Sequence, residues 1–352
     1  LTLEEGMIRL GLGGTSTKAI ESIMSPETIQ NDGPNGIYSY PLGQYANTDK
    51  ASTDPCAVDA NDPNLAYKFG TMANETVIAQ TFNKDLANEY GKICGNYSLW
   101  SNLTIFWGCG TNLHRTPYNA RNHEYYSEDA VLTSGQAVAF ISGGKEYGVI
   151  IAPKHLAFND TEINRTGVSV FMTEQQAREN ELRGTQASIE DAGALGIMTA
   201  FNRVGITAAN AHTGLLKNIL RGEWGFKGLE SQDFIMNPNY AVLKEYALNG
   251  GTMTTFTGEN TMAAVSEKFA YWTTENVGQD TELMGAIKQA MTWQAYALAN
   301  SNALDGMASS TRLVSVRTWY DNALVAVQVV FAALTVLAAA MYVLNDRKSK
   351  KQ

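Results

Sequence analysis

The residues best suited to chemistry in this sequence lie in the segments that follow short predicted strands. Lys154 and His155 follow the run VIIA, and Asp233 follows LESQ. Phe201 opens the stretch FNRVG after IMTA, and Arg121 lies in the long polar stretch after LTIFW. A carboxylate such as Asp233 can be a nucleophile or can cap a following helix, and residue type alone leaves both roles open. Cationic neighbours would lower the pKa of such a carboxylate and keep it ionised.

The apolar runs are predicted β-strands, and longer helical patterns alternate with them. Strand followed by helix, repeated, predicts parallel strands joined by crossover helices. Continuous apolar runs are typical of parallel strands that are buried on both faces. The predicted strands are 103–107, 149–152, 197–200 and, more weakly because of Glu230, 229–232; the predicted helices are 84–93, 127–141, 173–183, 213–221, 240–248 and 282–299.

The position of the polar residues favours a barrel. In a (β/α)8 barrel the carboxyl ends of all strands meet at one mouth, where the active site lies. A doubly wound sheet also binds ligands at these ends. However, no Gly-rich turn follows an early strand, and GLGG at 11–14 follows an amphipathic stretch, so we interpret it as a helix end. We therefore predict an α/β protein with a TIM-like (β/α)8 barrel over residues 1–303.

The C-terminal region predicts a single transmembrane helix. Residues 323–344 read ALVAVQVVFAALTVLAAAMYVL and contain no charge, and about 20 apolar residues suffice to cross a bilayer. The tail 345–352 is more basic than the predicted linker 304–322. Because the more basic flank stays in the cytoplasm, we expect a single-pass protein of the cell membrane with an extracellular barrel and a cytoplasmic tail.

Composition excludes one class of partner and gives no sign of a metal. The formal net charge of -9 argues against nucleic-acid binding, which needs clustered Lys and Arg. Hydrophobic residues make up 44% and charged residues 17% of the chain, a balance typical of a folded core. Cys56, Cys94 and Cys109 share no metal-ligand spacing, so we expect buried free thiols.

A series of motifs in the first 260 residues or so resembles glycoside hydrolase family 3, whose members include β-glucosidases. The motifs occur here in the same order as in that family. They are LTLEEG from Leu1, NDGPNGI from Asn31, QTFNKDLANEYG from Gln80, NLHRTPYNARNHEYYSED from Asn112, KHLAFNDTEINR from Lys154, ARENELR from Ala177, MTAFNRVG from Met198 and LLKNILRGEWGFKGLESQDF from Leu215.

The resemblance implies a retaining glycosidase that removes terminal sugars from β-glycosides or oligosaccharides. By position in the last motif, Asp233 would be the nucleophile. No metal or organic cofactor is implied, since two side chains suffice for this reaction. The residues that would bind the carbohydrate substrate are Asp32, Arg121, Lys154, His155 and Phe201.

Other roles for these residues remain open. Arg121 could form a structural ion pair with Glu124, Glu128 or Asp129, and Lys154 could be a solvated charge. Asp160 and Arg165 are expected to brace their loop rather than to contact substrate. The chain also departs from the family pattern, with Phe201 for the usual Tyr, Gln232 for Ser, Ala120 for Gly, and Glu230 and Ser231 for an apolar pair.

The resemblance also implies that half of the catalytic pair is missing. Family β-glucosidases usually take their acid/base Glu from an α/β sandwich domain, and no region here is long enough to form one. A single-domain branch uses a His beside a KHFPGHGD-type motif, where this chain has KHLAFND. We therefore expect the barrel half of a reversed-order enzyme that pairs with a separate sandwich domain. The alternative is a membrane-displayed carbohydrate-binding pseudoenzyme without turnover.

Overall fold

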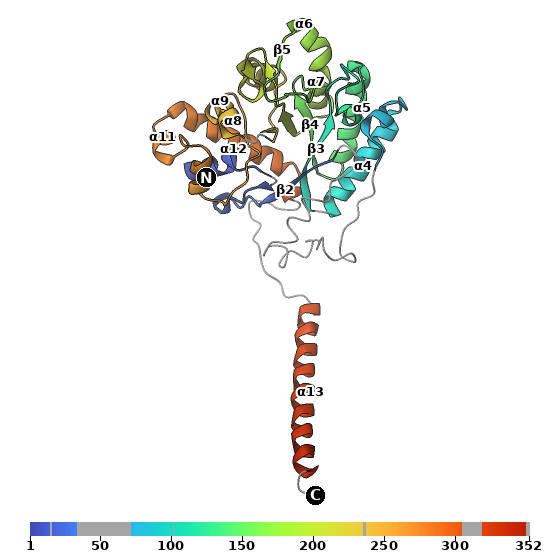
Figure 1. The fold of residues 1–352 in the computed structure, drawn as a ribbon, viewed down its shortest axis with the longest axis vertical. Helices are drawn as coiled ribbons and strands as arrows, with labels where there is room; N and C mark the ends of the chain where they lie inside the picture. Colours follow the sequence, from blue (N-terminus) through green and yellow to red (C-terminus); the bar gives the residue numbers. More distant parts are fainter. Residues whose placement is uncertain (15, 34–71, 101, 235–236, 305–318, 350–352) are drawn as a thin grey trace. The chain divides into compact units, whose positions relative to one another are not determined.

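The computed structural model describes residues 1–14, 16–33, 72–100, 102–234, 237–304 and 319–349. The chain divides into two compact units, Leu1–Asp305 and Gly306–Gln352. The first unit is an α/β domain, and the described part of the second is one long helix (Figure 1).

A six-stranded sheet forms the centre of the first unit, in the spatial order β1-β2-β3-β4-β6-β9. β1 and β2, which were not predicted as strands, are antiparallel to each other. Each later neighbouring pair is parallel, as the sequence predicts for β3, β4, β6 and β9. Parallel neighbours need crossover connections, which the helices between these strands supply. The strands are β1 (Ser16–Thr17), β2 (Thr28–Asp32), β3 (Leu103–Gly110), β4 (Ile150–Leu156), β6 (Gly196–Thr199) and β9 (Leu229–Gln232).

The sheet is a partial barrel of six strands in the described residues, where the sequence predicts eight. After β9 the chain contributes a single parallel bridge, between Ser231 and Met253. Residue 254 then connects to the start of the chain, because its N–H donates to Leu10 O at 2.8 Å and its carbonyl accepts from Gly14 N at 3.1 Å. The Tyr246 hydroxyl donates to Met253 O at 2.6 Å. This side chain thus satisfies a carbonyl group that would pair with a neighbouring strand if the sheet continued.

The predicted helices are present, and two of them include π-helical turns. The pattern at 173–183 becomes α6 (Glu174–Gln176) followed by the π-helical η3 (Ala177–Glu181), and that at 213–221 becomes the π-helical η5 (Gly214–Glu223). GLGG does end the first helix, as expected. The other helices of this unit are α1 (Leu3–Gly11), η1 (Glu21–Ile23), α3 (Glu75–Ala79), α4 (Lys84–Trp100), η2 (Asn122–Glu124), α5 (Ala130–Lys145), α7 (Arg183–Glu190), η4 (Ala209–Ala211), α8 (Pro238–Ala241), α9 (Leu243–Leu248), α10 (Met262–Lys268), α11 (Thr274–Gly278), α12 (Thr281–Ala299) and η6 (Asn302–Leu304).

Helices α4 and α5 pack backbone to backbone beside β3 and β4 (Figure 1). A side chain at Gly91 would overlap the carbonyl of Phe140, and one at Gly143 would overlap the carbonyl of Asn88. Glycine at both positions therefore allows the close approach. The pair buries an apolar cluster with the outer face of β3, to which Phe106 contributes.

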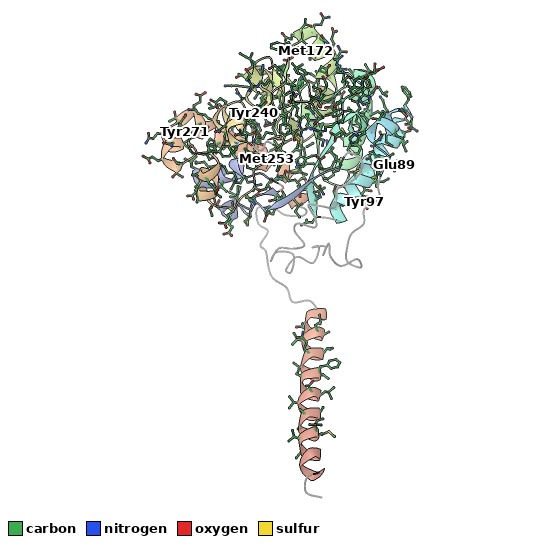
Figure 2. The ribbon with its side chains drawn as sticks, viewed as in Figure 1. Glu89, Tyr97, Met172, Tyr240, Met253 and Tyr271 are labelled. Atoms are coloured by element: carbon green, nitrogen blue, oxygen red, sulfur yellow. The ribbon has the colours of Figure 1, made fainter. Side chains whose placement is uncertain are left out.

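The opposite face of the strands forms the interior of the partial barrel. Ile150 and Ala152 of β4, with Leu229 of β9, belong to a buried cluster around Met253, which lies in the middle of the first unit (Figure 2). Successive side chains of a strand alternate between faces. Lys154 lies two positions after Ala152, and Asp233 lies four positions after Leu229. This alternation therefore brings both residues to the carboxyl end of the interior.

Segments that follow β4 and β6 form a second, smaller sheet at this end. Its strands are β5 (Ser169–Val170), β7 (Arg203–Val204) and β8 (Thr207–Ala208), in the order β5-β7-β8. β5 and β7 are parallel, and β7 and β8 are antiparallel. The loop between β4 and β5 is therefore fixed at its far end, and this loop carries residues of the site.

The second unit contains α13 (Trp319–Ser349). Within its segment Asn322–Leu344, an 18-residue window has a mean hydropathy of 2.4 and no buried part, so by length and composition the segment could cross a membrane. The predicted span 323–344 lies within this segment. The predicted linker 304–322 falls mostly outside the described residues. Among the cysteines, Cys94 and Cys109 are buried and free, as predicted, whereas Cys56 lies outside the described residues.

Candidate active site

All six residues that the sequence singles out lie at the carboxyl ends of the strands and join one continuous set of contacts. These contacts, described below, link Asp32 at the end of β2 to Lys154 in β4, and the adjacent His155 in β4 to Asp233 after β9. The residues are Asp32 at the end of β2, Arg121 directly before η2, Lys154 and His155 in β4, Phe201 after β6 and Asp233 after β9.

Asp32 and Lys154 form an ion pair at one side of the site. Lys154 Nζ donates to Asp32 Oδ1 at 2.6 Å, with the lysine side chain buried and the aspartate 40% exposed. Burial lowers the pKa of Lys154, but Asp32 and Glu124 outweigh it and raise the pKa above its usual value. Lys154 is therefore a buried cation, not the solvated charge considered as its alternative.

Arg121 does form the ion pair that the sequence left open, and its partner is Glu124. Glu124 also lies 3.6 Å from Lys154 Nζ, so one carboxylate orients both cations. Burial raises the pKa of Glu124, but Lys154 and Arg121 outweigh it and hold the pKa below its usual value. A second carboxylate, Glu162, lies 3.6 Å from Arg121.

His155 is a neutral imidazole that lies between two polar side chains, Asn112 and Tyr125, and Asp233. Its backbone N–H donates to Asn112 Oδ1 at 2.9 Å, and its Nδ1 lies 3.3 Å from the hydroxyl of Tyr125. Burial, with the positive charges of Arg121 and Lys154, lowers the pKa of His155 well below its usual value. Its Nε2 lies 3.5 Å from Asp233 Oδ2.

Asp233 is a buried carboxylate with one free oxygen. Its Oδ1 accepts from Phe234 N at 2.6 Å, while Oδ2 has no hydrogen-bond partner among the residues that the structure describes. The alternative role as a helix cap is not observed, because Asn237 caps α8. Burial raises the pKa of Asp233 to about 6, against the opposing charges of Arg121 and Arg165.

Arg165 and Glu162 are the site residues that the sequence did not identify. Arg165 was expected to brace its loop, and it does pair with Glu162 at 2.9 Å. The same guanidinium nitrogen, however, lies 4.0 Å from Asp233 Oδ2. Both residues belong to the polar stretch after β4, which was the available signal. The contact of Arg165 with Asp233 depends on how that loop folds toward the end of β9.

Two of the departures around the end of β9, Glu230 and Gln232, lie on the other face of the strand, whereas Ser231 shares the face of Asp233. Glu230 and Gln232 alternate with Ser231 and Asp233, so they point away from the interior. Gln232 Oε1 accepts from Asn210 Nδ2 at 2.8 Å. Burial raises the pKa of Glu230 to about 7, which lets a carboxyl group occupy a position that suits an apolar residue. These substitutions alter the support of Asp233 without entering the site.

The arrangement suits chemistry on a polar, uncharged ligand. It presents an ionisable carboxylate with one unengaged oxygen, surrounded by fixed donors of positive or neutral charge. Within the described residues, no group of three or more His, Cys, Asp or Glu side chains could hold a metal ion.

Comparison with known proteins identifies the family to which this site and fold belong. The model described as "Glycosyl hydrolase family 3 N terminal domain" matches residues 64–251. That is more than half of the 352 residues. The chain therefore belongs to glycosyl hydrolase family 3, as the motifs indicate.

Similar proteins carry β-glucosidase names. Over 238 residues the chain is 36% identical to "Beta-glucosidase BoGH3A" of Bacteroides ovatus, covering 66% of this chain and 30% of that protein. It is 31% identical over 218 residues to "Probable beta-glucosidase J" of Emericella nidulans, covering 62% and 23%. The structure of β-glucosidase 3B from Thermotoga neapolitana in complex with glucose matches with a TM-score of 0.71 at 25% identity, covering 87% of this chain and 42% of that one. The chain thus matches less than half the length of each of these proteins.

Proposed function

We propose that this chain is the nucleophile-bearing part of a retaining glycoside hydrolase that removes terminal sugars from β-glucosides. The observation that most strongly supports this proposal is the environment of Asp233, a buried carboxylate whose Oδ2 has no hydrogen-bond partner in the described residues and faces His155 and Arg165. With its pKa raised by burial to about 6, Asp233 is mostly ionised at neutral pH. The β-glucosidase names of the relatives support the substrate class.

In this mechanism Asp233 attacks the anomeric carbon of the sugar. A bond forms between its oxygen and that carbon as the glycosidic C–O bond breaks, and the departing oxygen takes a proton from an acid/base group. Water then attacks the same carbon, gives its proton to the acid/base group and releases Asp233.

The other site residues would hold the sugar. Asp32 is the accessible acceptor, and its pairing with Lys154 fixes its position. Arg121, Lys154 and His155 supply donors to hydroxyl groups around the ring. Fixed donors and acceptors of this kind orient a substrate for attack and so lower the barrier.

We infer that the acid/base group lies outside this chain, on a sandwich domain. Two carboxylates pair with the arginines that act on Asp233, and both are engaged. Glu124 pairs with Arg121 and is kept ionised by its neighbours. Glu162 contacts Arg121 and Arg165 and accepts from Asn159 Nδ2 at 3.0 Å. Neither is therefore suited to donate a proton to a leaving oxygen.

A carbohydrate-binding protein without turnover is the second candidate, and this lack of an available proton donor favours it. The two candidates differ in how the isolated chain responds to leaving groups. A positioned proton donor contributes roughly 10²–10⁴-fold to rate, but dinitrophenolate leaves without one. We expect the isolated chain to release dinitrophenol from an aryl β-glucoside slowly and to leave cellobiose uncleaved.

Added azide should accelerate breakdown of the glycosyl-enzyme, because it attacks without a general base. The Asp233→Ala variant is the control and should release no dinitrophenol above the background rate. Sugar binding without any dinitrophenol release would establish the second candidate. Ordinary turnover of cellobiose would place the acid/base group within these residues.

We also propose that α13 anchors the chain in the cell membrane. The apolar segment Asn322–Leu344 supports a single span, and the basic residues that follow it support a cytoplasmic tail. The first unit would then face the exterior, where β-glucosides of other organisms or of the cell surface are accessible.

A further inference from the structure

The guanidinium group of Arg165 lies over the ring of Phe201 in a cation–π contact. The central carbon of the guanidinium is 4.0 Å from the ring centroid. Phe201 is buried, with 4% of its surface exposed, whereas the Arg165 side chain is 30% exposed. A buried ring therefore supports a more exposed cation.

Two further contacts fix the direction of the Arg165 side chain. One guanidinium nitrogen lies 2.9 Å from Glu162 Oε2 and 4.0 Å from Asp233 Oδ2. The Phe201 ring and the two carboxylates therefore surround the guanidinium group, and the nitrogen that pairs with Glu162 is also the one that faces Asp233.

The contact between Phe201 and Arg165 matters because Arg165 is one of the positive charges that act on Asp233. His155 is neutral, so it adds no positive charge to the pair. Arg121 and Lys154 act on Asp233 as well, and each of the three cations also pairs with another carboxylate. No hydroxyl donates to Asp233 Oδ2 in the described residues, and Phe201 cannot supply one.

We propose that Phe201 is a positioning residue, whose ring holds Arg165 against Asp233 so that the carboxylate stays ionised for attack. This assignment rests on the proposed function and replaces the expectation that Phe201 contacts the sugar. Substituting the ring by an aliphatic side chain would release Arg165 towards solvent. Loss of the nearby cation would then favour the protonated carboxyl group.

The test is a titration of Asp233 in the full chain, followed by the carboxyl-carbon NMR signals of aspartate-labelled protein. The Asp233→Asn variant assigns the signal, so the measurement does not depend on turnover. We expect Arg165→Gln to raise the pKa of Asp233 by about one unit, a tenfold change in the proton-binding constant. Phe201→Leu should shift it in the same direction by about half as much.

Two control variants separate positioning from general damage. Phe201→Tyr keeps the ring and should not raise the pKa of Asp233. Arg178→Gln removes an exposed arginine that pairs with Glu174 and Glu223, and should leave the pKa unchanged. If Phe201→Leu does not fold, Phe201→Met retains an apolar side chain without a ring and gives the same reading.

The outcomes separate this proposal from the function on which it rests. An upward shift in Arg165→Gln without one in Phe201→Leu or Phe201→Met would overturn the role of the ring. An unchanged pKa in Arg165→Gln would overturn the proposal entirely. If the shifts occur but Asp233 forms no glycosyl-enzyme with an activated glucoside, the electrostatic arrangement stands and the proposed function fails.

Discussion

At the scale of single residues, the site lowers the stability of the folded protein at neutral pH, because Asp233 is ionised in a buried position. The pKa of Asp233 is about 6 in the folded chain, against an ordinary value of 3.8. The folded protein therefore binds this proton more tightly than the unfolded chain does. The resulting contribution to stability is complete below pH 3.8 and is lost as the pH rises to about 6.

Replacing Asp233 by Asn should therefore stabilise the protein at neutral pH. The two pKa values differ by about two pH units, so the gain is at most about 3 kcal/mol. We expect a higher free energy of unfolding for Asp233→Asn at pH 7.5, and little difference from the native chain at pH 3.5. Urea unfolding at both pH values measures this. If Asp233→Asn and the native chain were equally stable at pH 7.5, the nearby positive charges would fully offset the cost of burying the Asp233 carboxylate.

The sequence could predict those site residues that stand next to a strand end. Lys154, His155 and Asp233 lie at the ends of predicted strands, and the structure does bring them together. The role of Arg165 could not be predicted, because it depends on a loop that folds toward the end of another strand. Glu124 was considered only as a partner of Arg121, and its contact with Lys154 required the tertiary arrangement.

At the scale of elements, the end of β3 must pass very close to η2, which carries Glu124. A side chain at Gly110 would overlap the carbonyl oxygen of Glu124 and approach the ring of Tyr125. The Gly110 N–H in turn donates to the buried carboxyl group of Glu75 at 2.9 Å. Glycine at this position thus sets the distance between the sheet and the Arg121–Glu124 ion pair.

The Gly110→Ala variant should displace η2 and weaken both stability and sugar binding. Overpacking of this kind costs about 1–3 kcal/mol. Gly285→Ala is the matched control, because nothing lies within 4 Å of the added carbon in α12, and alanine favours a helix. Thermal unfolding and glucose titration compare the two. A Gly110→Ala protein as stable as Gly285→Ala would contradict the close packing at this point.

The elements themselves were largely predictable, because their apolar periodicity is strong. The strand at 229–232 was predicted with the same bounds as β9, despite Glu230, whose raised pKa explains its tolerance. The π-helical turns in η3 and η5 could not be predicted, since they keep the apolar face of an ordinary helix. The number of strands was not predictable either, because the contacts of 252–254 depend on Tyr246 and on residues near the N-terminus.

At the scale of the whole molecule, the proposed anchor makes a prediction about sidedness. In intact cells, protease added outside should digest the first unit, while an epitope placed after Gln352 should stay protected. Permeabilised cells are the control, in which both should be cleaved. A protected first unit with a cleaved tail would reverse the orientation, and a chain released by carbonate washing would exclude the span.

The central claim is that Asp233 forms a covalent bond with the sugar, and trapping that intermediate tests it most directly. A fluorinated glucoside with a dinitrophenyl leaving group needs no proton donor for the first step, and its fluorine slows the second. Mass spectrometry of the digested chain should find the fluoroglucosyl group on the peptide that contains Asp233. Labelling should slow as the pH falls below about 6, because Asp233 is then protonated, and Asp233→Ala should not be labelled. A label on another carboxylate, or none after prolonged incubation, would contradict the account.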